Sequence, residues 1–276
     1  MATNFSGRDG YSFFTGVVED RNDPLRVGRV RVRCLGYHTE NKTELPTVDL
    51  PWASVMAPTT SPSMSGLGST PSFLVEGSWV VGFFRDADLQ EPLVIGTLPG
   101  IPSTLADTKQ GFNDPNGTYP RAANEPDTSS LARGTQKYPV TLSDSIGIPS
   151  DPYAGEYPKV HVYETESGHL KEYDDTENNE RIRERHKSGT FYEIHPNGDK
   201  VQSIVHDQYT LVAGNDSIQV KGNVRIVVEG DVQLTAATGT VNIASGDVIA
   251  NGISLVNHTH TDTAGLAAGT TTKPNS

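Results

Sequence analysis

Three copies of one short pattern follow one another in the C-terminal part of the chain: Val212-Ala-Gly-Asn215, Val220-Lys-Gly-Asn223 and Val228-Glu-Gly-Asp231. The copies recur every 8 residues, and a fixed short period is typical of a stacked repeat rather than of a globule. Each unit offers about six strand residues and a Gly-Asn or Gly-Asp corner, where a positive φ costs little. The repeat therefore predicts a β-solenoid.

The apolar residues between these corners lie at alternate positions, as Ile218, Val220, Ile226 and Val228 show. Alternate residues of a strand share one face, so each strand of the repeat has one narrow apolar face. A lone chain cannot close a core around so thin a column. The repeat thus predicts association with further chains.

The composition excludes a helix bundle. The 276 residues include 27 Gly and 18 Pro, which disfavour helix interiors, and few long segments are free of both. The formal net charge of −12 excludes a nonspecific nucleic-acid binder, because such proteins use a surplus of Lys and Arg. Cys34 is the single cysteine, so no disulfide forms within the chain, and a small core residue is expected there.

Neither a membrane span nor a signal peptide is expected. No apolar run approaches the roughly 18 residues that cross a bilayer. The segment from Met1 to Arg8 lacks the apolar region of a signal peptide. We therefore expect synthesis in a cytoplasm.

Residues 1–98 are expected to form a small closed barrel of five short strands, each bounded by turn residues. In the second strand Val alternates with Arg, so Arg29, Arg31 and Arg33 are expected to share one solvated face. The five strands are predicted at 13–19, 28–35, 50–56, 78–84 and 92–96.

The next segment, 99–158, contains nine prolines and little hydrophobic periodicity. It predicts an extended linker, too short and too poor in apolar residues for a catalytic domain. Alternation resumes at Lys159, where four apolar-polar runs separated by Ser-Gly and Asn-Gly turns predict a stack of β-hairpins.

Several motifs match a known family together. The barrel closes with Val75 to Asp86 and Glu91 to Gly96, which read as a buried strand ending in aromatics, an acidic turn and a strand with a glycine bend. The hairpins contain Thr165 to His169, Asp175 to Ile182 and Ser188-Gly-Thr190 in matching order and spacing. Over nearly its full length the chain resembles the central spike proteins of contractile phage tail baseplates, which are related to type VI secretion spikes.

This resemblance implies an all-β architecture in which the barrel is an oligonucleotide/oligosaccharide-binding (OB) fold. One well-known family member carries a lysozyme domain between barrel and spike, which 99–158 is expected to lack. The implied domains are an OB-fold barrel (1–98), an extended linker (99–158), a β-hairpin region at the start of the spike (159–206), a trimeric triple-stranded β-helix (207–254) and a metal-bearing tip (255–276).

The candidate metal site is His258-Thr259-His260. On an extended segment residues i and i+2 face the same way, so both imidazoles can point at one axis. In a single chain such a pair is more often a solvated polar turn. At the end of the threefold column that the resemblance implies, three copies would supply six nitrogens, an octahedral set that suits Fe²⁺ better than tetrahedral Zn²⁺. The resemblance thus implies one iron per trimer, held by His258 and His260.

The other candidate site residues are expected to have structural roles, and no catalytic residue is expected. The other six histidines are scattered, with no Cys at ligand spacing. Asp174 and Asp175 point to opposite strand faces and are expected to shape a turn rather than flank a glycosidic bond. The run from Arg181 to Lys187 is interleaved with Glu184 and predicts a mixed solvated face, with an anion site as the alternative.

These inferences predict a mechanical function in the virion. A homotrimeric spike would sit on the baseplate hub protein and pierce the bacterial outer membrane when the sheath contracts. A type VI secretion or tailocin spike is the near alternative, and a cell-wall-degrading tail enzyme is the alternative of another class. A receptor-binding fibre is disfavoured, because 251–276 contains no aromatic residue other than histidine.

Overall fold

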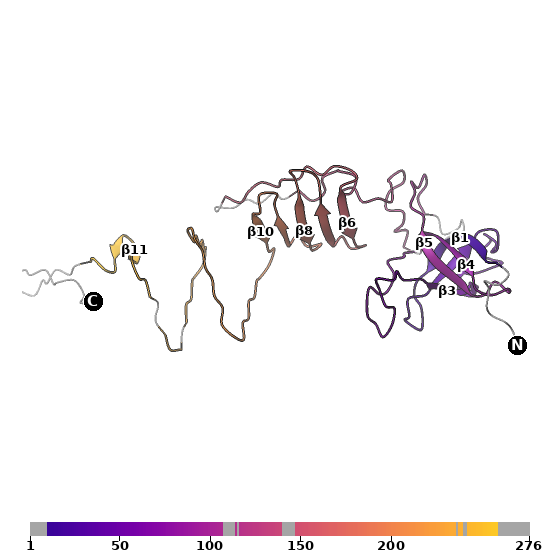
Figure 1. Ribbon diagram of the computed structural model, residues 1–276, viewed down its shortest axis with the longest axis horizontal. Helices are drawn as coiled ribbons and strands as arrows, with labels where there is room; N and C mark the ends of the chain where they lie inside the picture. The colour runs from indigo at the N-terminus through magenta and orange to yellow at the C-terminus, as the bar shows by residue number, and fades with distance from the viewer. Residues whose placement is uncertain are drawn as a thin grey trace, which may run out of the picture. The chain divides into compact units, whose positions relative to one another are not determined.

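In the residues that the computed structural model describes, the regular secondary structure is made of β-strands (Figure 1) and one short 3-10 turn, η1 (Thr47–Asp49). The predicted all-β class is therefore confirmed for the part of the chain that the structure describes. In that part no helix is both long enough and apolar enough to span a membrane. The chain divides into two compact units, Met1–Asn215 and Asp216–Ser276. The described residues are 10–106, 114, 116–139, 147–235, 237–239 and 242–258.

The N-terminal strands close into a five-stranded OB-like barrel, as predicted, in the order β1-β2-β3-β5-β4. All neighbours are antiparallel except β3 and β5, which run parallel. Each strand overlaps its predicted range. The strands are β1 (Ser12–Asp20), β2 (Val30–Cys34), β3 (Trp52–Val55), β4 (Trp79–Phe84) and β5 (Pro92–Thr97).

Alternate residues of these strands fill the barrel interior. Phe14, Val18, Val32 and Val80 are among the buried apolar residues. Gly82 lies where the register of β4 and β5 shifts, and a Cβ atom there would lie 2.1 Å from the carbonyl oxygen of Leu93. Only glycine allows this close approach of the two strands.

The prediction of one solvated arginine face on β2 is wrong at Arg33, whose side chain is 1% exposed. Its Nε and Nη2 donate to the two carboxylate oxygens of Glu19 at 2.7 and 3.0 Å. Its other donors reach the carbonyls of Thr39 and Leu45, because the loop after β2 folds over the guanidinium. Arg31 matches the prediction better, since it stays partly exposed beside the ring of Trp52.

The hairpin region forms a second, fully antiparallel sheet in the order β10-β9-β8-β7-β6 (Figure 1). Gly168, Gly189 and Gly198 take a positive φ in the turns that join its strands, which is why Ser-Gly and Asn-Gly stand there. The strands are β6 (Val160–Glu164), β7 (Leu170–Asp174), β8 (Arg181–Arg185), β9 (Phe191–Ile194) and β10 (Lys200–Ser203).

The repeat region lacks regular pairing in this single chain. Between 204 and 248, none of the described residues belongs to a strand. A two-residue hairpin follows, with β11 (Ile249–Ala250) and β12 (Ile253–Ser254) joined by Asn251-Gly252, both at positive φ. The trimeric β-helix of 207–254 therefore stays a prediction.

Candidate functional site

One face of the five-stranded sheet carries charged side chains in a row. Glu172 of β7, Arg183 of β8 and Glu193 of β9 stand directly opposite one another on neighbouring strands. All three are at most 1% exposed. Opposite charges on directly opposed residues attract, so the row stabilises the pairing of the three central strands.

Arg181 extends this row into a cluster. Its Nη2 lies 2.6 Å from Glu172 Oε1, its Nη1 lies 2.9 Å from Asp151 Oδ1, and its guanidinium sits 4.6 Å from the ring centre of Tyr153. Asp151 and Tyr153 belong to the predicted linker, which here covers the sheet. We call 129–139 and 147–156 the strap, and the buried charges beneath it the ionic core.

The strap also contacts the sheet through its backbone. Arg183 Nη2 donates to the carbonyl oxygen of Tyr138 at 2.6 Å, and Leu131 is fully buried. The expected mixed solvated face of 181–187 is therefore wrong for Arg181 and Arg183, because the strap covers the face to which both point. Ile182 and Glu184 point to the opposite face and are exposed, as strand alternation requires.

Burial dominates the electrostatics of the ionic core. Desolvation raises the pKa of Glu172 and of Glu193, and the neighbouring guanidiniums of Arg181 and Arg183 oppose that rise. Glu193 is further contacted by His195, whose Nε2 lies 3.2 Å from Oε1. Carboxylates and guanidiniums thus face one another as ion pairs inside the protein.

The predicted turn-forming aspartates behave as expected. Asp174 is 2% exposed and accepts a hydrogen bond from the backbone of Thr176 at 2.9 Å. The side chain of Asp175 is 72% exposed and lies 3.5 Å from His161. The two carboxylates point to opposite faces and do not flank a common space.

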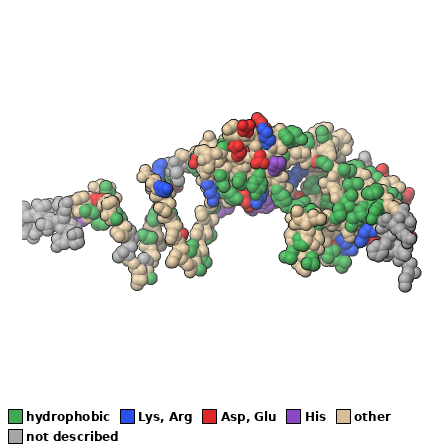
Figure 2. Space-filling model, viewed as in Figure 1, with side chains coloured by type: hydrophobic (Ala, Val, Ile, Leu, Met, Phe, Trp, Pro, Cys, Tyr) green, Lys and Arg blue, Asp and Glu red, His purple; other side chains and the backbone are tan. Residues whose placement is uncertain are grey.

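The outer surface of the barrel carries an aromatic patch, which we define as Tyr11, Phe13 and Phe83. Tyr11 and Phe13 are 48% and 58% exposed, and the rings of Tyr11 and Phe83 are 4.6 Å apart. Hydrophobic side chains also gather over the barrel in Figure 2. Exposed apolar patches of this kind mark protein interaction surfaces.

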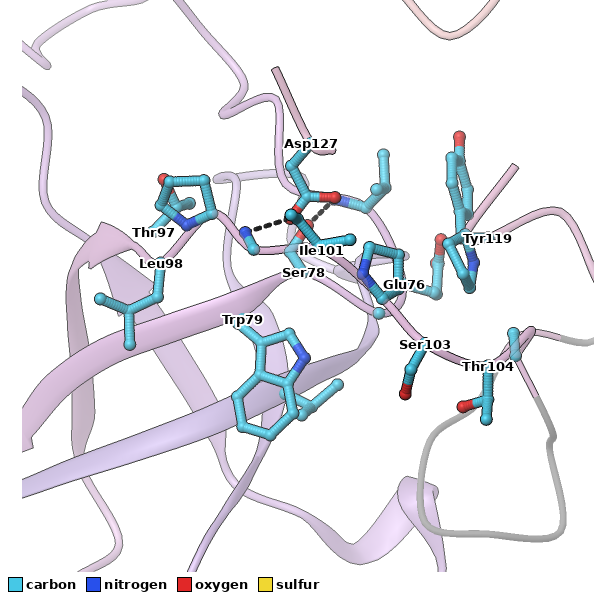
Figure 3. A pocket seen from close by; sticks show the side chains of 18 of the residues that line it. Glu76, Ser78, Trp79, Thr97, Leu98, Ile101, Ser103, Thr104, Tyr119 and Asp127 are labelled. Atoms are coloured by element: carbon cyan, nitrogen blue, oxygen red, sulfur yellow. Dashed lines mark hydrogen bonds between the residues drawn. The ribbon is translucent and has the colours of Figure 1, made fainter. Parts of the chain in front are cut away.

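A hollow of about 1000 Å³ lies between the barrel and the start of the linker. Trp79, Leu98 and Ile101 supply apolar walls (Figure 3). Asp127 accepts a hydrogen bond from the Gly100 backbone at 2.8 Å and thereby ties two parts of the linker together. The described lining includes hydroxyls and carboxylates but no His, Cys or Lys, so it does not supply the base of a nucleophilic triad.

The apolar side chains of the repeat are exposed in this single chain. Ile218 is 83% exposed, Ile226 77% and Leu234 79%. Burying such side chains is favourable by roughly 1.5–3 kcal/mol each. Their exposure leaves a strong driving force for association.

His258 is half-buried after β12, and its Nδ1 lies 2.8 Å from the carbonyl oxygen of Ser254 and 3.1 Å from that of Leu255. A carbonyl only accepts, so Nδ1 is the donor in these contacts, and in a neutral ring Nε2 then holds the lone pair that ligates a metal. His260 lies outside the described residues, so the pairing of the two ligands stays a prediction. Among the described residues, His258 included, no group of three or more His, Cys, Asp or Glu side chains is placed to hold a metal.

Three of the other histidines contact neighbouring groups. His38 Nδ1 accepts a hydrogen bond from the backbone of Cys34 at 3.0 Å. The rings of His169 and His186 lie 4.5 Å apart. Cys34 is fully buried, and burial raises the pKa of its thiol to about 12, which suits a core residue and not a nucleophile.

These features define a class: an all-β protein in which a closed OB-like barrel precedes a hairpin sheet and a repeating C-terminal segment. The chain belongs to the family of the Gp5 N-terminal OB domain, which matches residues 36–184 and so covers more than half of it.

Two relatives carry the name Gp5. The chain is 39% identical to "Protein Gp5" of Vibrio phage KVP40 over 275 residues, which cover 82% of this chain and 65% of that protein. It is 44% identical to the "Pre-baseplate central spike protein Gp5" of Enterobacteria phage T4 over 128 residues, which cover 45% of this chain and 22% of that protein. The match thus spans less than two thirds of the length of either relative.

Proposed function

We propose that this chain is a structural, membrane-piercing central spike of a contractile phage tail baseplate. The observation that carries the proposal is its similarity to a T4 protein named as a pre-baseplate central spike protein, together with the family match, which spans the barrel from β3 onward, the linker and the first strands of the hairpin sheet. The location that follows is the virion, at the tail baseplate.

The proposed spike is a homotrimer with a triple-stranded β-helix over 207–254. The exposed Ile218, Ile226 and Leu234 support this assembly, because three parallel chains would bury these side chains against one another. The same winding would give the unpaired backbone of the repeat its hydrogen-bond partners. A stiff shaft with fully paired strands suits a needle that is driven through an envelope.

The barrel is proposed to seat on the hub protein of the baseplate. The aromatic patch of Tyr11, Phe13 and Phe83 supports this, since aromatic side chains dominate the energetics of protein interfaces. The envelope is the proposed target of the opposite end of the chain.

The proposed tip holds one iron per trimer through His258 and His260. The tautomer of His258 fits a metal ligand, and a bound metal would tie together three chain ends that would otherwise fray. Replacing both histidines with alanine is expected to leave the trimer intact, because the shaft core lies elsewhere, and to lower the metal content to background.

Elemental analysis of extensively dialysed protein measures this directly. About one iron for every three chains is the expected result for an octahedral six-nitrogen site. No metal, or one zinc per chain, would contradict the tip site. The Asn257→Ala variant serves as the control, because it changes the neighbouring side chain and keeps both imidazoles.

Two experiments separate the proposal from its alternatives. Sedimentation at micromolar concentration is expected to give a trimer, and a monomer would overturn the spike. Zymography on cell-wall substrate is expected to give no clearing, and clearing by the purified protein would favour a tail enzyme instead. A type VI secretion or tailocin origin would be recognised by its neighbouring genes.

A further inference from the structure

Three parts of the first compact unit meet at one side chain, Glu166, in the turn between β6 and β7. Arg21, which follows β1 of the barrel, donates Nη1 to Oε2 at 2.7 Å and Nη2 to Oε1 at 2.9 Å. The hydroxyl of Tyr119, in the linker, donates to the same carboxylate. Barrel, linker and sheet thus share one anionic group.

Further contacts fix the partners of Glu166 in place. The Nε of Arg21 lies 3.3 Å from Glu76 Oε2, so the guanidinium is held from the barrel side as well. Arg121 donates to the backbone carbonyl of Glu166. The planar fork of a guanidinium on a carboxylate restricts orientation as well as distance, unlike a contact between point charges.

The protonation states of Glu166 and Tyr119 fit their roles as hydrogen-bond acceptor and donor at this junction. The hydrogen bonds from Arg21 and Tyr119 lower the pKa of Glu166 to about 2, so the acceptor stays ionised at neutral pH. Burial and the bond to Glu166 raise the pKa of Tyr119 to about 12, so its hydroxyl keeps the proton that it donates. Donor and acceptor therefore persist over the whole physiological range.

We infer that Glu166 is a positioning residue that fixes the hairpin sheet and the linker to the barrel. A mechanical role for this contact rests on the proposed function, because a spike must transmit force from the barrel on the hub to the shaft. The contacts themselves lie within one chain and do not depend on assembly. Tyr163 beside Phe73, with ring centres 5.0 Å apart and nearly perpendicular, is a second barrel-to-sheet contact close to the same turn.

Loss of the Glu166 side chain is expected to loosen the placement of the linker and the hairpin sheet against the barrel, while both the barrel and the sheet stay folded. The side chains of Arg21 and Glu166 are 36% and 48% exposed, and partly exposed pairs contribute little to global stability. The strands of the barrel and the sheet keep their own ladders without it. The linker around Tyr119 and Arg121 should be released.

The test uses tryptic cleavage after Arg121 in the full-length protein, followed by mass spectrometry. Glu166→Gln and Arg21→Gln are each expected to speed cleavage there several-fold, and the double variant no more than either alone, because both act through one junction. The matched control is Glu177→Gln, an exposed glutamate in the turn between β7 and β8, which should match wild type.

Three results would overturn the inference: unchanged cleavage in both single variants, equal acceleration in Glu177→Gln, or effects that multiply in the double variant. Sedimentation of every variant is measured beside the cleavage. A wild-type protein that is monomeric and yet shows the coupled acceleration would reject the proposed spike and keep the junction. Should Glu166→Gln fail to fold, Arg21→Gln tests the same contact from the barrel side.

Discussion

The hairpin sheet and the repeat segment use the same alternation of side chains and reach opposite outcomes. In the sheet the inward face is covered by the strap of the same chain, so that even Arg183 is 1% exposed. In the repeat the apolar face stays open, and Ile218 is 83% exposed. Alternation defines which side chains share a face, but a covering segment decides whether that face is buried. The sheet is complete in one chain, and the repeat is not.

The largest expected effect is loss of the trimer when a charge is introduced into the apolar face of the repeat. Ile226→Asp would place three unpaired carboxylates in one layer of the proposed β-helix, and each uncompensated buried charge costs about 3–5 kcal/mol, a cost that the trimer would bear three times. We expect loss of the trimer in sedimentation, with the barrel still folded. Val227→Asp, one position along, is the control, since alternation predicts that its side chain points to the other face of the proposed β-helix. A trimer that survives Ile226→Asp would show that this face is not the core.

A smaller effect tests the ionic core. Arg183→Met would leave Glu193 buried with less compensation and should destabilise the sheet by about 3–5 kcal/mol. Hydrogen exchange of the β8 and β9 amides measures this. Arg185→Met is the matched control on the same strand, because Arg185 contacts the ring of Tyr138 and is only half-buried. Adding Glu193→Gln to Arg183→Met should restore part of the protection, and no recovery would argue against charge as the cause.

The smallest expected effect is that the stability of the Glu166 junction and the stability of the ionic core depend on pH in opposite directions. The pKa of Glu166 falls from 4.5 to about 2 on folding, so its stabilising contribution is complete above pH 4.5 and is lost as the pH falls toward 2. Burial raises the pKa of Glu172 and Glu193, so their contribution has the opposite sign and is lost as the pH rises through their folded values.

Hydrogen exchange between pH 2 and 5, corrected for intrinsic rates, separates these two signs. Acidification should release the linker around Tyr119, while the protection of β7 to β9 is kept or increases. The Glu166→Gln variant should lack the pH dependence of the linker and keep that of the sheet. Simultaneous loss of protection in both regions would contradict the assignment.

The sequence predicted the barrel well, because its core depends on local alternation. Val30 and Val32 face inward as their spacing requires. It failed at Arg33, Arg181 and Arg183, since alternation does not show which strand face another segment will cover. The loop over Arg33 follows β2 directly, and the strap over Arg181 and Arg183 precedes β6 in the chain. Acidic residues on neighbouring strands that face the same side as these arginines, such as Glu19 and Glu172, were the available signal. The sequence held no such signal for the junction at Glu166, because the residues that meet there are far apart in sequence.

The tip remained a prediction for a different reason. His258 and His260 are close in sequence, but their proposed iron site needs three chains. No local pattern in one chain encodes where a neighbouring chain will lie. The His258 tautomer is the part of the site that one chain alone determines.

The self-contained sheet has a consequence for the assembly of near-identical repeats. Corners that recur every 8 residues would allow three chains to associate one repeat out of step, at little loss of contact. The strap-covered sheet does not repeat, and each chain completes it before the repeat begins. In the proposed trimer the sheet therefore sets the register of the repeats. With the three sheets at the same level, the repeat of every chain starts at the same residue, and a shift of one repeat between chains is excluded.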